Sequence, residues 1–422
     1  MSGVVHVVGA GLAGLSSAVR LTQAGCRVAL WEAAGQAGGR CRTFWDPRLG
    51  RDVDNGNHLV LSGNRSVAAY LSIIGAERAM QTLPAARFAF ADLASGERWT
   101  VEMSEGRVPW WVMRPGTRIP GTGLADYLAA LRLPLAGADR TVGDTIGARG
   151  PLWQRFWEPL TLAVLNTTPE RGAAQLLWRA MAETFARGGA YCRPMLAPNG
   201  LGRALVDPAV AWLTARELEP EFDHALKAVE RAGDRVTALI YANGREVRLT
   251  SSDSVVLALP PTRLKSVLPE IDVPDDRSAI LNAHFTVPPG LLDARPPITG
   301  LVNAKTHWVF VRGDVASLTI SAADRLGVMD RAPEELIPML WQETCAALNL
   351  GNAAYIAARI NKERRATFDQ SPSGVARRPS ATTPLTNLWL AGDCTQTGLP
   401  ATIEGAVRSG ETAAGLAVRG MA

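Results

Sequence analysis

A run of valines near the start of the chain leads directly into a Gly-x-Gly-x-x-Gly pattern, and this combination constrains the fold more than any other feature. Residues 4–8 are Val-Val-His-Val-Val, a composition typical of a buried parallel strand. The glycines of the pattern are Gly9, Gly11 and Gly14, and the apolar residues after them keep helical spacing. Because the glycines then lie at a strand-to-helix turn, the segment predicts a dinucleotide-binding fold.

Each glycine has a physical role in such a turn. Gly9 permits the tight turn, Gly11 lets a pyrophosphate approach the backbone, and Gly14 lets the helix pack closely on the strand. The first helical turn, which includes Ala13, offers free N–H groups and the positive end of the helix dipole to phosphates. The turn therefore predicts nucleotide binding.

The residues after this helix complete the nucleotide-binding unit. A second strand is expected at 27–31, and Glu32 at its end can accept hydrogen bonds from the ribose hydroxyls of an adenosine. The chain then reads Gly38-Gly39-Arg40. Small residues and a guanidinium group suit a bridging diphosphate, because the guanidinium can donate parallel hydrogen bonds to two oxygens.

This order of motifs resembles the flavin-dependent amine oxidase and phytoene desaturase superfamily. In that superfamily the Gly-Gly-Arg segment lies along the pyrophosphate of FAD, so the resemblance implies that FAD is the cofactor. A second motif stands near the other end of the chain, where the strand-like run 387–391 is followed by Gly392 and Asp393. By resemblance, Asp393 binds the ribityl chain and the N-terminus of the next helix faces the flavin, where it would stabilise the anionic reduced ring. This implies further FAD contacts at Ala401, Thr402, Ile403 and Ala406.

The same resemblance implies three FAD contacts in the middle of the chain. The segment 52–61 passes beside the isoalloxazine ring, which makes Asn57 a contact. Backbone near Leu226 touches the adenine, and Pro260 lies close to the cofactor.

Three further motifs narrow the resemblance to the squalene-associated branch, the hydroxysqualene dehydroxylases of hopanoid-producing bacteria. They are Trp-Glu-Pro-Leu at 157–160, Leu-Asn-Thr-Thr-Pro-Glu at 165–170 and Lys-Glu-Arg-Arg-Ala-Thr-Phe at 362–368. The resemblance covers essentially the whole chain and departs from the branch at Asn57, where Gln is expected before the His. It implies reduction of an allylic alcohol, hydroxysqualene, to squalene with loss of water.

Such a reaction needs a proton donor, a hydride donor and a dry apolar cavity. A proton lets the hydroxyl leave as water, N5 of reduced FAD delivers hydride to the allylic carbon, and exclusion of water prevents recapture of the cation. His58 is the candidate proton donor, with Asp54 and Glu158 as alternatives. His58 and Asp54 could instead only satisfy hydrogen bonds within a buried loop.

The expected fold class is α/β, with a Rossmann-like FAD-binding domain of the glutathione-reductase type and an inserted α+β substrate domain. The FAD-binding domain is expected to be discontinuous, over 1–85, 195–275 and 380–422. The substrate domain should comprise 86–194, a largely helical part, and 276–379, a mixed sheet with a helix. Helical spacing is seen at 124–131 and 333–348, strand-like runs at 283–287, 307–311 and 317–321, and an antiparallel meander over 226–249.

Composition sets limits on partners and location. The five cysteines are scattered without a Cys-x-x-Cys, which predicts a reduced, cytoplasmic setting and no metal site. The formal net charge of +4 is too mild to indicate nucleic-acid binding.

No apolar run is long enough to span a bilayer. Since the implied substrate is membrane-soluble, we expect peripheral, monotopic attachment to the inner face of the cytoplasmic membrane. Trp110, Trp111 and Met113 are either a contact with that membrane surface or ordinary core residues.

Other functions remain open at this stage. The same flavin fold also carries carotenoid-type desaturases or isomerases and amine oxidases, although Lys305 is the one lysine in the substrate-side sequence that could serve an amine oxidase. A non-catalytic flavin-bearing partner of a squalene synthase is a further alternative. No second dinucleotide fingerprint is present, so the external electron donor is unidentified.

Overall fold

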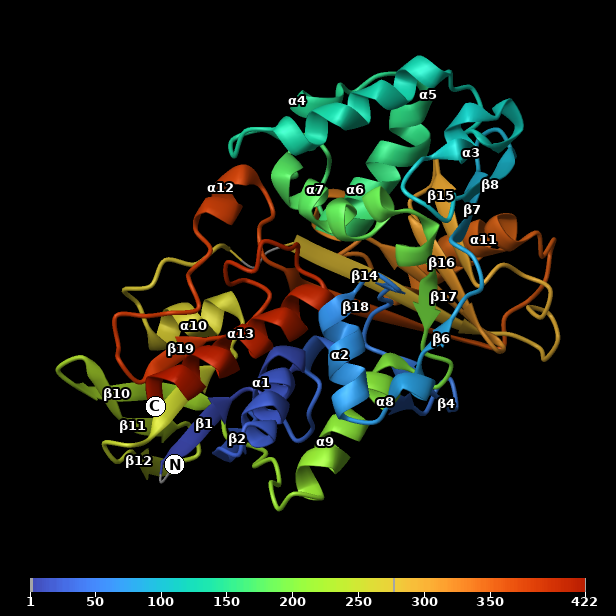
Figure 1. Cartoon of the computed structure of the whole chain (residues 1–422). Coiled ribbons are helices and arrows are strands. Elements are labelled where there is room, and N and C mark those ends of the chain that lie inside the picture. Colours follow the sequence, from blue (N-terminus) through green and yellow to red (C-terminus); the bar gives the residue numbers. More distant parts are fainter. Residues whose placement is uncertain (1–2, 276–277, 422) are drawn as a thin grey trace.

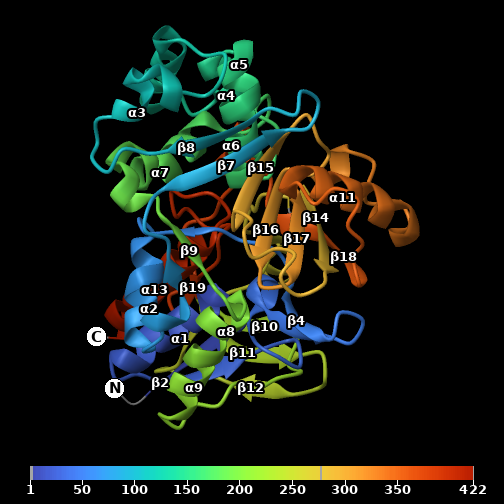
Figure 2. The same ribbon diagram turned by 90° about the vertical axis from the view of Figure 1, so that its right-hand side faces the viewer.

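The computed structural model describes residues 3–275 and 278–421 and shows two domains packed side by side (Figure 1). One is built around a four-stranded sheet and the other around a seven-stranded sheet. The two ends of the chain lie near each other at the edge of the first domain (Figures 1 and 2).

The four-stranded sheet is parallel and has the order β19-β13-β1-β2. Its strands are β1 (Val4–Val8), β2 (Arg27–Trp31), β13 (Ser254–Leu257) and β19 (Leu388–Leu390). They come from all three segments in which the sequence predicts FAD binding. Val-rich runs suit this position, because a parallel sheet covered on both faces buries nearly every side chain.

Two helices from opposite ends of the chain pack closely on this sheet. They are α1 (Leu12–Gln23) and α13 (Ile403–Met421). A Cβ atom on Gly410 would lie only 2.3 Å from the Ala13 carbonyl oxygen, so the helices can approach this closely only with glycine at this position. Their contact carries the C-terminal motif to the first glycine turn.

A partly buried ion-pair network fixes the start of α13. Glu404 accepts hydrogen bonds from the backbone N–H groups of Ser66 and Val67, at 2.9 and 3.0 Å, and so caps the N-terminus of α2 (Arg65–Ile73). Arg408 donates to Glu404 at 2.8 Å and also pairs with Glu183 of α7 (Ala174–Glu183). The network joins the helical part of the substrate domain to the FAD-binding domain.

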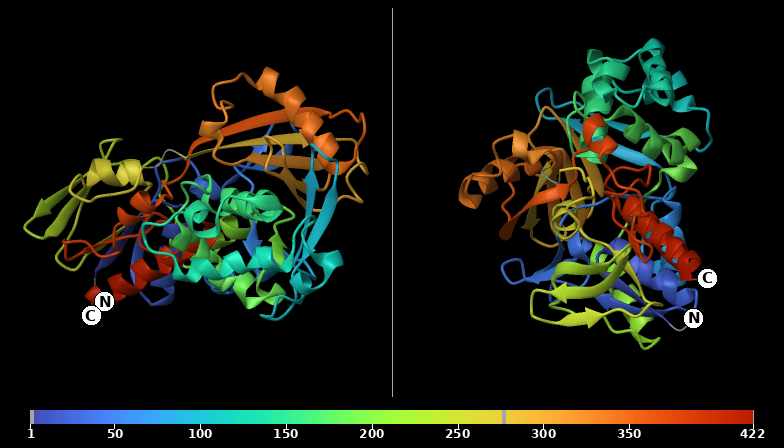
Figure 3. Two further views of the ribbon diagram at one scale, coloured as in Figure 1. Left: turned by 90° about the horizontal axis from the view of Figure 1, so that it is seen from above. Right: turned by 90° about the vertical axis from the view of Figure 1, so that its left-hand side faces the viewer.

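The sequence-predicted meander is confirmed as a three-stranded antiparallel sheet, β10 (Leu226–Ala232), β11 (Arg235–Tyr241) and β12 (Glu246–Arg248). Seen from above, it projects on the side away from the seven-stranded sheet (Figure 3). Short elements complete this part of the molecule: η1 (Gly39–Cys41), β3 (Thr43–Asp46), β4 (Arg51–Asp54), β5 (Val60–Leu61), η2 (Glu77–Ala79), β6 (Gln81–Thr82), β9 (Pro194–Leu196), α8 (Leu201–Leu205), α9 (Asp207–Thr214), α10 (Pro261–Val267) and α12 (Pro372–Ala376).

The seven-stranded sheet has the order β18-β14-β17-β16-β15-β7-β8. The pair β7 and β15 is parallel, and the other neighbours are antiparallel. The strands are β7 (Arg87–Asp92), β8 (Arg98–Glu102), β14 (Ser278–Thr286), β15 (Ile298–Val302), β16 (Trp308–Arg312), β17 (Val315–Ile320) and β18 (Ala357–Thr367).

One face of this sheet packs on α11 (Pro333–Leu348), which the sequence predicts with the same bounds. Leu281 and Phe285 of β14 share a hydrophobic cluster with residues of α11. Because side chains alternate along a strand, Asn282 and His284 lie on the opposite face. That face carries polar groups into the interior.

Helices and turns of residues 110–191 cover the end of the molecule away from the termini (Figures 1 and 2). Residues 124–131, where the sequence predicts a helix, form part of a longer 3₁₀ helix, η4 (Leu124–Leu135). The other elements here are α3 (Trp110–Met113), η3 (Pro115–Thr117), α4 (Val142–Ile146), α5 (Gly150–Leu152), the π-helical turn η5 (Trp153–Trp157), α6 (Glu158–Leu165), η6 (Phe185–Arg187) and η7 (Gly189–Tyr191), and η8 (Ala323–Arg325) follows β17. Among the described helices, none has the length and apolar character needed to cross a bilayer.

Candidate active site

The first glycine turn has the geometry that a dinucleotide requires. Gly9 has a φ of +106°, and a Cβ on Gly14 would lie 1.7 Å from the Gly9 carbonyl oxygen. Gly11 at the start of α1 differs, because a Cβ there would have no neighbour within 4 Å. Two glycines thus allow the turn and the close packing of the helix. The third leaves open space at the helix N-terminus, and Ala13 lies in the first turn.

Glu32 lies at the end of β2, beside this turn. Its carboxylate accepts hydrogen bonds from the backbone N–H groups of Ala10 at 2.6 Å and Ala34 at 2.9 Å. The Ala10 carbonyl in turn accepts from the N–H of Gly38 at 2.8 Å. These bonds hold the Gly38-Gly39 segment against the first glycine turn.

Arg40 joins the two predicted FAD motifs directly. One guanidinium nitrogen pairs with the Asp393 carboxylate at 2.7 Å, and another donates to the Ala366 carbonyl at 2.7 Å. The charge of Asp393 raises the pKa of Arg40. The Arg40 side chain is nevertheless 39% exposed, whereas that of Asp393 is 7% exposed. The arginine therefore remains accessible to a ligand between the motifs.

The loop after Asp393 is held by Arg378, a buried residue that the sequence analysis missed. Arg378 donates to the carbonyls of Asp393 and Leu399, both at 2.9 Å, and to the Thr397 hydroxyl at 2.7 Å. Burial lowers the pKa of Arg378 to about 10. The arginine fixes the approach to the α13 N-terminus.

Other expected FAD contacts lie around the same region. Gly392, with a φ of +139°, donates its N–H to the Ser409 hydroxyl at 2.8 Å, and the N–H of Ala401 donates to Gln370 at 2.9 Å. Ile403 is the first residue of α13. In the first turn of this helix, the Thr402 hydroxyl accepts the N–H of Gly405 and the Thr402 carbonyl accepts the N–H of Ala406.

Leu226 and Pro260 both lie near the carboxyl end of the first sheet. Leu226 is buried in a cluster with Val8 and Trp31, the last residues of β1 and β2. Pro260 is exposed and precedes α10, directly after Leu259, whose carbonyl oxygen is 3.7 Å from the position of a Cβ on Gly392. The structure thus brings both expected contacts to the end of the sheet that carries the glycine turn.

The His58 loop lies between the two domains. Asn57 donates from its amide to the Thr319 hydroxyl at 3.1 Å, and Thr319 donates to Asn282 at 2.9 Å. A Cβ on Gly56 would lie 3.4 Å from the Asn282 amide nitrogen and 3.6 Å from His58 Nε2. The imidazole of His58 therefore sits against the polar face of the seven-stranded sheet.

The side chain of His58, unlike that of Asp54, stays unengaged. Within residues 3–275 and 278–421, its imidazole makes no hydrogen bond. Burial lowers the pKa of His58, and Arg40 lowers it further, while Asp54 and Asp393 act in the opposite direction. His58 thus responds to the charges of both FAD motifs.

Asp54 is engaged by structural partners on both carboxylate oxygens. One oxygen accepts from the Thr43 hydroxyl at 2.5 Å and the Leu201 N–H at 2.9 Å, and the other pairs with Arg312 at 2.8 Å. These contacts join β3, α8 and β16 around the His58 loop. The geometry favours a role for Asp54 in holding this junction.

Glu158 lies apart from these two residues. It is exposed at the start of α6, where the surrounding protein and the neighbouring Glu170 raise the pKa of its carboxyl. Among the described residues, no hydrogen bond or ion pair joins Glu158 to His58 or Asp54.

Three polar residues at the domain junction were missed by the sequence analysis: Asn282, Arg312 and Thr319. The alternation of apolar and polar residues in Leu281-Asn-Ala-His-Phe-Thr286 is the signal that could have revealed the first. Arg312 and Thr319 lie on strands whose interior face is known only once the sheet is assembled.

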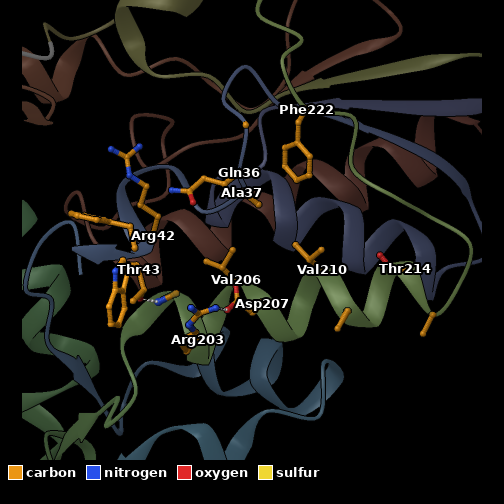
Figure 4. A pocket seen from close by; sticks show the side chains of 16 residues that line it. Gln36, Ala37, Arg42, Thr43, Arg203, Val206, Asp207, Val210, Thr214 and Phe222 are labelled. Atoms are coloured by element: carbon orange, nitrogen blue, oxygen red, sulfur yellow. Dashed lines mark hydrogen bonds and ion pairs between the residues drawn. The ribbon is translucent and has the colours of Figure 1, made fainter. Parts of the chain in front are cut away.

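A cavity of about 800 Å³ lies beside the first motif, between the 35–37 loop and α9 (Figure 4). Gln36 and Arg42 line one side of the cavity, and Arg203 and Asp207 line another. Phe222 also lines it and lies near the top of Figure 4. It contains none of the sequence-predicted site residues. In the described part of the chain, no group of three or more His, Cys, Asp or Glu side chains could hold a metal ion.

Comparisons with known proteins agree with this geometry. The model of the family described as flavin containing amine oxidoreductase matches residues 12–288 and 359–418. A hydroxysqualene dehydroxylase of Rhodopseudomonas palustris is 44% identical over 99% of this chain and 98% of its own. One of Zymomonas mobilis is 41% identical over 98% of this chain and 99% of its own.

Solved structures show the same fold at low identity. A putrescine oxidase variant superposes with a TM-score of 0.72 at 15% identity, over 98% of both chains. A putative protoporphyrinogen oxidase from Exiguobacterium gives 0.68 at 13% identity, also over 98% of both chains. Fold, glycine turn and the joined motifs define a flavin-dependent oxidoreductase. The chain belongs to the flavin-containing amine oxidoreductase family and, within it, to the hydroxysqualene dehydroxylase branch.

Proposed function

We propose that the chain reduces hydroxysqualene to squalene, using FAD as its cofactor. The carbon–oxygen bond breaks, a hydride is added to the allylic carbon, and a proton leaves with the hydroxyl as water. The observation that carries the proposal is the similarity to three hydroxysqualene dehydroxylases, at 41–44% identity over 98–99% of the chain. Both domains are included, so the substrate side is matched as well as the nucleotide side.

FAD in particular is supported by the residues at both ends of the chain. Open space beside Gly11 suits a pyrophosphate at the α1 N-terminus, and the guanidinium of Arg40 is accessible beside it. Glu32, beside the first glycine turn, and Asp393, beside Arg40, are the candidates for binding the two sugar-derived parts of the cofactor. When bound in its reduced form, FAD supplies hydride.

The chain's own residues supply the proton and a dry environment. The unengaged imidazole of His58 is the candidate that donates a proton to the departing hydroxyl, and Asn57 holds its loop on the second domain. A hydrophobic cluster that includes Phe88, Trp153 and Trp157 lies next to this junction and contacts Leu59. Apolar walls of this kind disfavour water, which would recapture an allylic cation.

Attachment to the inner face of the cytoplasmic membrane is part of the same proposal. Its support is chemical, since a C30 alcohol dissolves in the hydrocarbon of a bilayer rather than in water. The exposed Trp110 and Met113 favour contact with an interface. An external reductant of unidentified class must regenerate reduced FAD after each turnover.

The deciding experiment is a single turnover without oxygen. The protein with FAD is reduced, hydroxysqualene in detergent micelles is added, and flavin absorbance and extracted product are followed together. We expect one squalene and one reoxidised FAD per active site. An oxidised enzyme that is instead bleached by a polyene or an amine, with no squalene formed from hydroxysqualene, would make the chain a desaturase or an amine oxidase.

A further inference from the structure

The helical layer carries an exposed apolar surface formed by two neighbouring segments. We call it the leucine–tryptophan face, and its members are Val108, Trp110, Met113, Leu124, Leu128, Leu131 and Leu135. Their exposed fractions run from 43% for Leu124 to 84% for Leu135. Apolar groups exposed together in this way mark an interaction site more often than scattered single residues do.

The two segments form one surface because buried aromatic rings join them. Trp111 of α3 is 7% exposed, and its ring meets that of Tyr127 of η4 edge to face, with centroids 5.5 Å apart. The Tyr127 hydroxyl accepts the N–H of Ile119 at 3.1 Å, and Leu133 is buried. One side of η4 is thus anchored in the core while its other four leucines, Leu124, Leu128, Leu131 and Leu135, are exposed. Figures 1 and 2 place α3 at the end of the molecule away from the termini.

The charges around this face have nearly one sign. Residues 107–135 contain four arginines and no lysine, against a single acidic residue, Asp126. Arg107, Arg114 and Arg132 are exposed, and none of the three forms an ion pair with another described residue. Free guanidinium groups beside exposed leucine and tryptophan match a surface in which phosphates border hydrocarbon.

We propose that the leucine–tryptophan face docks the enzyme on an anionic lipid bilayer. The apolar side chains enter the hydrocarbon boundary, and the three unpaired arginines bind lipid phosphates. The inference rests on the proposed function, because a hydrocarbon-soluble substrate gives the enzyme a reason to approach a bilayer. It goes further by assigning the contact to two short segments of the helical layer.

Flotation with vesicles tests the apolar part of the contact. The full-length protein with FAD is mixed with vesicles of phosphatidylcholine containing phosphatidylglycerol, and the floating fraction is measured. We expect Leu128→Ser, Leu131→Ser and Leu135→Ser, combined in one variant, to bind at least about tenfold more weakly, because their burial in the interface is lost. A matched control replaces Leu326 and Ile356, which are exposed elsewhere, and should bind like the wild type.

A second set of variants tests the charge. Replacing Arg107, Arg114 and Arg132 by glutamine should abolish the preference for phosphatidylglycerol over pure phosphatidylcholine vesicles. The control carries the same change at Arg27, Arg78 and Arg245, exposed arginines of the FAD-binding domain. Equal loss in both sets would show general charge attraction and overturn the assignment.

Tryptophan fluorescence gives a readout that does not depend on these variants. Brominated lipids should quench the wild type more than Trp110→Phe, because Trp110 is the exposed tryptophan of this face. Trp45 is also exposed but lies on β3, outside the face. Equal quenching of the two proteins would overturn the proposal. So would self-association of the wild type that the leucine variant abolishes, because the face would then be a contact between two copies. Turnover in detergent micelles is measured in parallel. Turnover without vesicle binding would refute only the docking surface, whereas vesicle binding without turnover would refute the proposed function.

Discussion

The imidazole of His58 lies in surroundings that favour its neutral form. Burial lowers its pKa from the ordinary value of 6.5, and the charge of Arg40 adds to this effect. A proton donor acts in its protonated form, so the rate should rise as the pH falls below 6.5. We expect single-turnover rates of the reduced enzyme to show this rise, and His58→Gln to lose it together with roughly 100-fold in rate.

The control for this prediction is Asp54→Asn. Because Asp54 pairs with Arg312, this variant should lower stability. Since Asp54 also raises the pKa of His58, the rise in rate should move to lower pH but should not be abolished. If His58→Gln with bound FAD retained the wild-type rate and pH profile, the proton would have to come from another group.

Two glycines of the first turn should respond differently to alanine. Gly14→Ala places a Cβ 1.7 Å from a backbone oxygen, so it should destabilise the FAD-free protein by about 3 kcal/mol or more. Gly11→Ala meets nothing in the protein and has an ordinary φ of −71°. Its FAD-free melting temperature should be unchanged, but FAD binding should weaken about tenfold through contact with the pyrophosphate. Thermal melts and FAD titrations measure the two effects, and normal FAD affinity of Gly11→Ala would place the pyrophosphate elsewhere.

His284 should make folding dependent on pH. It is 1% exposed, and burial lowers its pKa to about 4 from 6.5. The unfolded chain binds a proton at His284 more tightly than the folded protein does. The stability that depends on a neutral His284 is therefore complete above pH 6.5 and is lost as the pH falls towards 4. The loss should reach about 3 kcal/mol. Urea unfolding at several pH values should show a shallower dependence for His284→Gln, and an identical slope would contradict the prediction.

Among the elements, α13 depends on a buried carboxylate in its first turn. Glu404 is 3% exposed and satisfies two N–H groups of α2 as well as Arg408. Glu404→Ala should therefore lower the free energy of unfolding by about 3 kcal/mol, because it leaves buried donors unpaired. Glu411→Ala, on the same helix, removes a partly exposed pair with Arg20 and should cost less than about 1 kcal/mol. Chemical unfolding compares them, and equal effects would mean that the network has no special role.

Elements with strong local signals could be predicted from the sequence. The glycine turn, the meander and α11 each carry their pattern within a few residues. The strand Ile298–Val302 was not predicted, because Gly300 and the surrounding prolines obscure its pattern and its parallel pairing with β7 is made across about 200 residues.

The site residues likewise fall into those that a local motif predicts and those that depend on the assembled fold. Gly9, Gly11, Gly14 and Asp393 follow from motifs, and the structure brings their two segments together through Arg40. The contacts of Asn282, Arg312 and Thr319 depend on how two sheets meet, which no local pattern encodes. Arg378 was missed because burial of an arginine is rare and depends on the carbonyls that surround it.

For the whole molecule, FAD should act as a structural component. Its expected contacts come from both ends of the chain and from the middle, so binding favours the complete fold over any part of it. At free FAD 100 times above its dissociation constant, the gain is about 2.7 kcal/mol. Melting temperature measured against FAD concentration should rise accordingly. ADP-ribose, which lacks the isoalloxazine, should give a smaller rise, and an equal one would contradict contacts at the second motif.

The pairing of Arg40 with Asp393 also has a consequence for biosynthesis. During translation, α1 and its glycine turn emerge from the ribosome long before β19 and α13, which complete the sheet and its cover. A nascent chain therefore cannot assemble the cofactor site until nearly all of it has been made. Flavin insertion becomes a step that follows synthesis, and a transcript broken late in the gene would yield a protein without colour.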